Sequence, residues 1–182
     1  MIMRRAAVTR ALAGAALAAA VVAAAAPATA APARARTHAT TAVRNASNKK
    51  PAHLSPFSAR LVAVMNAARK DHGLAPLKAV ESIGKVASGW SARIASDGQL
   101  SHNPQLAGQI QRIFPHWQWI EENVGAMGGG SAQSADDGQR LAEAYLASPM
   151  HRDNILDPNV RWIGVANALG GGSIWNTVDF VG

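Results

Sequence analysis

The chain has 182 residues, contains no cysteine and carries a formal net charge of +7. Residues 1–54 hold eight of the 18 basic residues and none of the 11 acidic ones, so the remainder of the chain is close to neutral. A near-neutral domain has no strong field to attract phosphate, which argues against nucleic-acid binding. The lack of cysteine excludes disulfides and a thiol nucleophile.

The first 30 residues have the features of a secretory signal peptide. Three arginines between positions 4 and 10 precede the uncharged, alanine-rich residues 11–26, and Ala28-Thr29-Ala30 is a small-x-small cleavage site. The alternative is an uncleaved membrane anchor, but the apolar run is short and weakly apolar for a span. We therefore expect a secreted, extracellular chain with no transmembrane span after cleavage.

Residues 31–54 are predicted to be a basic, disordered tether. They are rich in Ala, Thr, Arg, Asn and Lys and have almost no large apolar side chains. Such a segment cannot bury enough surface to offset the entropy lost on ordering. Its charge allows weak contact with an anionic envelope surface, but the usual behaviour of such a segment is to remain in solvent.

The folded domain is expected over residues 55–182, which is long enough for a hydrophobic core.

Two helices are predicted first along this domain, from apolar residues at helical spacing. One begins after Ser58, a candidate N-cap, and ends at Gly73. The other ends near Gly98, and its apolar face is expected to lie in the core. That face consists of Ile83, Val86, Ala87, Trp90 and Ile94.

The second half of the domain combines helices and strands. A short helix is predicted over residues 106–113, a strand over residues 117–126, and another helix from about Asp136 until just before a proline. Residues 162–166 and 174–180 flank a glycine-rich segment, which predicts a β-hairpin. Helices followed by a late hairpin indicate an α+β fold.

Three polar motifs follow one another along the domain. They are Ser101-His102-Asn103, Glu122-Asn123-Val124 and the segment Ser148–Leu156, and a strand pair punctuated by glycines follows them. In this order they resemble the bacterial type of the CAP superfamily (SCP-like domain), named after cysteine-rich secretory proteins, antigen 5 and pathogenesis-related proteins. The resemblance covers about residues 55–182 and implies a three-layer α-β-α sandwich around a central antiparallel sheet.

The resemblance also implies a cleft lined by two histidines and by acidic residues. His102 and His151 match the two histidines, and Glu122, followed by Asn123, matches the first acidic residue. The glycines that precede Glu122 and His151 in the family are replaced here, and no acidic residue stands at the family's second acidic position. We therefore expect His102, Glu122, Asn123 and His151 to line a ligand-binding cleft.

Two chemistries are open for these residues. His102, His151 and Glu122 can supply three ligands to a divalent cation such as Zn²⁺ and leave a fourth position open. Alternatively, they hydrogen-bond one another and hold loops in place without a metal.

Two functions are open as well. The first is a secreted binding module for a small molecule, a lipid or a protein, and the family resemblance favours it over a classical enzyme. The alternative is a protease-like, metal-assisted hydrolase in which Glu122 acts as the catalytic base.

Overall fold

The computed structural model of the protein describes residues 49–132 and 134–182. The predicted signal peptide and residues 31–48 of the predicted tether lie outside these ranges. The elements in chain order are α2 (Pro56–Asp71), β1 (Lys78–Ala79), α3 (Glu81–Asp97), α4 (Leu106–Ile113), β2 (Ile120–Gly128), α5 (Ala135–Ala147), α6 (Pro149–Leu156), β3 (Trp162–Gly170) and β4 (Ser173–Val181). None of the helices in the described ranges is long and apolar enough to cross a membrane.

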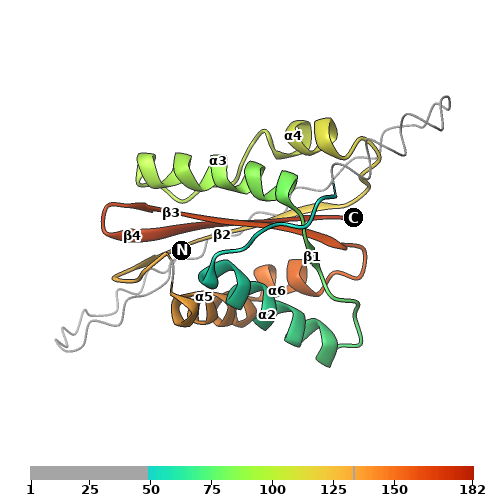
Figure 1. Ribbon diagram of the computed structural model, residues 1–182, viewed down its shortest axis with the longest axis horizontal. Coiled ribbons are helices and arrows are strands. Elements are labelled where there is room, and N and C mark those ends of the chain that lie inside the picture. Colours follow the sequence, from blue (N-terminus) through green and yellow to red (C-terminus); the bar gives the residue numbers. More distant parts are fainter. Residues whose placement is uncertain (1–48, 133) are drawn as a thin grey trace, which may run out of the picture.

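A four-stranded sheet in the order β1-β3-β4-β2 forms the middle of three layers (Figure 1). Helices α3 and α4 cover one face, and α2, α5 and α6 cover the other. This confirms the predicted α-β-α sandwich. The sheet itself is mixed rather than antiparallel, because the two-residue strand β1 pairs parallel to β3, whereas β2 and β3 both pair antiparallel to β4.

The predicted hairpin is confirmed and is longer than expected. Gly171 and Gly172 join β3 to β4 with φ angles of 59° and 75°. Two consecutive residues with positive φ form the tight turn whose twist matches paired strands, and glycine adopts that conformation without strain. The turn sets the register of the pair, so that Asp179 in β4 lies opposite Gly164 in β3. On its other side, Asp179 lies opposite Glu122 in β2.

Two predicted boundaries are corrected, and one further helix is found. Helix α2 starts three residues early, because the Ser55 side chain caps it by accepting a hydrogen bond from the Ser58 backbone and Pro56 occupies its first position. Pro149 lies beyond the end of α5, as predicted, and it also begins the additional helix α6, where a missing N–H costs nothing. Trp117 and Trp119 were expected in a strand, but they precede β2.

Each face of the sheet packs on its own apolar cluster. The larger cluster joins the sheet to α2, α5 and α6 and includes Phe57, Tyr145 and Phe180. The smaller one lies under α3 and α4 and includes Ile83 and Ile110. Burial on both faces makes the sheet a rigid support for the polar residues at its edge.

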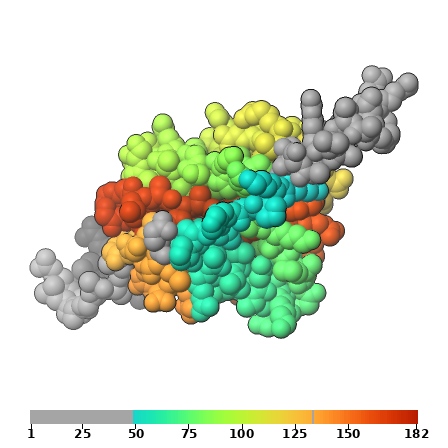
Figure 2. Space-filling model, in the orientation of Figure 1, coloured from blue at the N-terminus to red at the C-terminus, as the bar shows by residue number. Residues whose placement is uncertain are grey.

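Residues 49–54, which we assigned to the disordered tether, lie against the domain. Pro51 forms a β-bridge with Val80, the Glu81 backbone N–H donates to the Lys50 carbonyl, and Lys50 Nζ lies 2.9 Å from the Glu81 carboxylate. Figure 2 shows this segment in cyan on the surface, next to α3. For these residues the structure corrects the prediction, because backbone pairing, an ion pair and the packing of Leu54 on the larger apolar cluster hold the segment against the domain.

Candidate functional site

The centre of the candidate site joins the loop after α3 to strand β2. His102 Nδ1 lies 2.7 Å from Glu122 Oε1, and the backbone N–H of Asn103 donates to the same oxygen over 2.9 Å. The His102 side chain is 21% exposed, whereas the Glu122 side chain is 5% exposed. A buried carboxylate therefore holds a partly exposed imidazole in one orientation.

Trp90 holds the loop that carries His102. Its indole N–H donates to the Ser101 carbonyl over 2.7 Å, and the side chain is half-buried at the edge of α3. The prediction that Trp90 is a core residue is therefore wrong, although Ile83 on the same predicted face is fully buried. The helix is rotated so that Ser91 faces the sheet instead, where its hydroxyl bonds the Thr177 hydroxyl over 3.0 Å.

Asp179 is a buried acidic residue of this site that our sequence analysis missed. It lies opposite Glu122 in the sheet and is 0% exposed. It faces α3 and α4, because Thr177, two positions earlier in β4, contacts Ser91 of α3. Asp179 is the one charged residue in β4, and a lone charge in a predicted buried strand is the signal that could have identified it.

Glu122 and Asp179 form a carboxyl pair. Burial raises the pKa of Asp179 well above its ordinary range, and the negative charge of Glu122 and a hydrogen bond to that residue raise it further. Neither oxygen of Asp179 has a donor from another group among the described residues, and two ionised carboxylates cannot bond each other. A proton held by Asp179 therefore satisfies the pair.

Asn123 and His151 lie on the other face of the sheet, which α6 covers. Asn123 follows Glu122 in β2 and therefore points the opposite way. Its Nδ2 donates to the His151 backbone carbonyl over 3.1 Å, and its Oδ1 accepts from Asn154 over 2.8 Å. His151 is 1% exposed, its Nδ1 lies 2.7 Å from Ser148 Oγ, and its ring centroid lies 5.2 Å from that of Tyr145.

The structure therefore links the four predicted residues in two pairs, His102 with Glu122 and Asn123 with His151. Across residues 49–132 and 134–182, no group of three or more His, Cys, Asp or Glu side chains is arranged to hold a metal ion. Glu122 Oε1 is already engaged by two neighbours. This arrangement does not fit a three-ligand set, and metal binding by His102, Glu122 and His151 stays a prediction.

A second acidic cluster lies beside the site. Glu121 precedes Glu122 and faces α6, and its burial raises its pKa to about 8. A hydrogen bond to Asp157 and the charges of Asp157 and Asp153 also raise this pKa, whereas the charge of Arg69 lowers it. Glu121 is thus held largely protonated at neutral pH.

We expect the free energy of unfolding to fall as pH rises from 4.5 to about 8 because of Glu121. Over that range the folded state keeps a proton that the unfolded state releases, so the stabilisation present at acidic pH is lost on titration. Glu121 is partly exposed, so we expect a loss of about 2 kcal/mol rather than the full value of the pKa shift. Urea denaturation at about pH 5 and pH 8.5 measures it, and an equally steep fall in Glu121→Gln would contradict the prediction.

The family model described as the cysteine-rich secretory protein family (CAP) matches residues 62–178, which is more than half of the chain. The Bacillus subtilis protein YkwD, described as uncharacterized, is 29% identical over 152 residues, which cover 81% of this chain and 56% of YkwD. The chain thus spans just over half the length of that relative.

Solved structures show the same fold. An extracellular protein containing an SCP domain from Bacillus anthracis superposes with a TM-score of 0.53 and 25% identity, over 69% of this chain and 40% of that one. An outer surface protein from Borrelia burgdorferi superposes with a TM-score of 0.53 and 19% identity, over 66% of this chain and 88% of that one. Because the family model covers most of the domain that carries the His102 and Glu122 motifs, the chain belongs to the cysteine-rich secretory protein (CAP) family.

Proposed function

We propose that the protein is an extracellular CAP domain that binds a small molecule, a lipid or a protein partner at the surface around His102. The observation that carries the proposal is the 2.7 Å contact between His102 Nδ1 and Glu122 Oε1. It presents a partly exposed imidazole in a fixed orientation, and Trp90 fixes the loop that carries it. A few well-oriented polar groups of this kind give a binding site its specificity.

Secretion is part of the proposal. Its support from the sequence is the predicted signal peptide over residues 1–30. Two structures with the same fold come from proteins described as an extracellular protein and an outer surface protein.

The geometry favours binding over metal-assisted hydrolysis. In the hydrolase hypothesis Glu122 removes a proton from a water molecule, which requires that water to lie within hydrogen-bond reach. The Glu122 side chain is 5% exposed, and its Oε1 is engaged by His102 and Asn103. These contacts give Glu122 the role of orienting His102.

Replacing His102 by alanine tests the proposal. We expect native mass spectrometry of the protein recovered from its host's growth medium to detect a bound molecule on the wild type and not on His102→Ala. His72→Ala is the matched control, because His72 lies at the C-terminal end of α2, where it contacts Ala68. Equal adducts on all three proteins, or none on any of them, would contradict the proposal.

The same variant has an expected effect on stability. Without the imidazole, Glu122 keeps one donor fewer, so His102→Ala should lower the free energy of unfolding by about 1–2 kcal/mol. Circular dichroism establishes that the variant is folded. Zinc-dependent cleavage of a protein substrate that is lost in Glu122→Gln would instead favour the hydrolase.

A further inference from the structure

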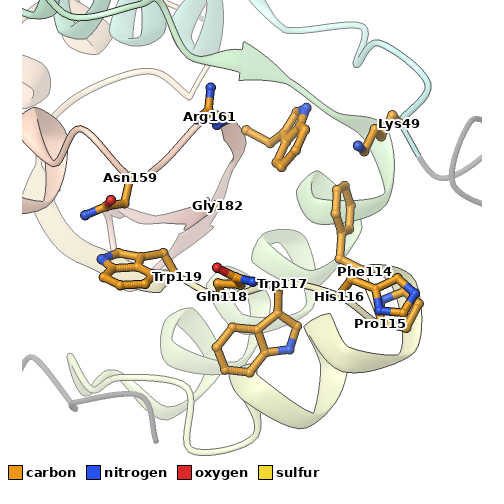
Figure 3. A pocket seen from close by; sticks show the side chains of 11 residues that line it. Lys49, Phe114, Pro115, His116, Trp117, Gln118, Trp119, Asn159, Arg161 and Gly182 are labelled. Atoms are coloured by element: carbon orange, nitrogen blue, oxygen red, sulfur yellow. The ribbon is translucent and has the colours of Figure 1, made fainter. Parts of the chain in front are cut away.

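A pocket outside the candidate site lies at the end of the sheet where β2 and β3 begin and β4 ends (Figure 3). Its volume is about 280 Å³. The lining includes four aromatic residues, Phe114, Trp117, Trp119 and Trp162, and three basic ones, Lys49, His116 and Arg161. None of the four residues predicted to form the cleft lines it.

Contacts between distant segments build the aromatic wall. The rings of Phe114 and Trp162 pack with centroids 5.5 Å apart, and Lys49 Nζ lies 4.0 Å from the centroid of Trp162. On the other side, the Gly182 carbonyl accepts hydrogen bonds from the backbone N–H groups of Gln118 and Trp119. These bonds hold the loop before β2 in place and leave the Trp119 side chain 43% exposed.

The charged side chains that line the pocket are all basic. No Asp or Glu side chain lines it. Lys49 and Arg161 form no ion pair with any residue in the ranges that the structure describes. Two exposed cations near the exposed Trp119 complement a ligand that carries both a ring and a negative charge.

We infer that this pocket binds a small organic anion built on a ring, such as an acidic sugar or an aromatic carboxylate. The ring packs against Trp119, and the carboxylate pairs with Arg161 and Lys49. The amides of Gln118 and Asn159, which also line the pocket, offer hydrogen bonds to hydroxyl groups of the ligand. The volume suits one ring rather than a long chain.

Titrations with small probes test the inference by following the indole N–H signals of the pocket's tryptophans by NMR. The ring anions are glucuronate and indole-3-acetate, and the reference probes are glucose, indole and acetate. We expect at least one ring anion to bind with a Kd of about 1 mM, as suits its size, and the reference probes to bind at least about tenfold more weakly. Preference for glucuronate identifies a sugar site, and preference for indole-3-acetate identifies a site for aromatic acids.

Matched variants locate the binding. Arg161→Gln and Trp119→Ala should each lower the affinity for the ring anion at least about tenfold. The first removes a partner of the carboxylate, and the second removes the surface on which the ring packs. Arg112→Gln on the neighbouring helix α4 and Leu169→Ala, whose side chain is 64% exposed near the hairpin turn, should bind as the wild type does. Ring anions that bind no better than acetate and the neutral probes would overturn the inference, and so would equal losses in all four variants.

The inference is independent of the proposed function. His102→Ala should leave the ring anion's affinity unchanged, because His102 does not line this pocket. If the probe titrations fail, the proposal for the His102 surface is unaffected. If the mass spectrometry of His102→Ala contradicts that proposal, the inference about this pocket is unaffected.

Discussion

Replacing Arg69 by methionine is expected to lower the free energy of unfolding by about 3–5 kcal/mol. Arg69 lies on α2, is 1% exposed and donates to four backbone carbonyls, one after α2 and three in the last turn of α6 and the segment after it. These carbonyls belong to Ala75, Ile155, Asp157 and Val160. Methionine fills much of the same volume but leaves all four without a donor, and each buried, unsatisfied acceptor is costly.

Urea denaturation measures this loss, and two further variants make the result specific. The free energy of unfolding of Arg69→Lys should lie between those of the wild type and the methionine variant, because an ammonium group cannot reproduce the planar arrangement of guanidinium donors. Arg93→Met is the control, since that exposed arginine on α3 makes one surface ion pair, and its loss should change stability by less than about 0.5 kcal/mol. A loss below about 1 kcal/mol in Arg69→Met would show that the carbonyls find other partners.

Gly164→Ala is expected to destabilise the protein by about 3 kcal/mol. A Cβ atom at this position of β3 would lie 2.4 Å from the Ile83 carbonyl carbon and 2.6 Å from the Gly84 nitrogen. Both are backbone atoms of α3, so they cannot relieve the clash by a change of rotamer as a flexible side chain can. Helix α3 would have to move away from the sheet, and the loop that Trp90 holds next to His102 would move with it.

The same substitution elsewhere in this layer should have the opposite sign. A Cβ at Gly89, inside α3, meets nothing within 4 Å. Gly89→Ala should therefore stabilise the protein by about 0.5–1 kcal/mol, because alanine loses less backbone entropy in a helix. Thermal denaturation of the two variants side by side measures both effects. If Gly164→Ala proves as stable as the wild type, the helix and the sheet are not packed as closely as the structure places them.

Local patterns made much of this protein predictable. Two glycines between alternating strands specify the hairpin, since other residues avoid a positive φ at both turn positions. Helical spacing of apolar residues located α3 and α5. The order of the His102, Glu122 and His151 motifs indicated the family, because a motif is a property of neighbours in the chain.

Other features depend on which segments meet in space. The pairing of Asp179 with Glu122 is set by the register between β4 and β2, and the half-buried position of Trp90 is set by the rotation of α3 against the sheet. Glu122 and Asn123 are adjacent in sequence, yet the alternation of strand side chains sends them to opposite faces, where separate helical layers meet them. The energies that fix register and rotation come from burial summed over distant segments, and for that reason tertiary structure alone decided how the site is divided.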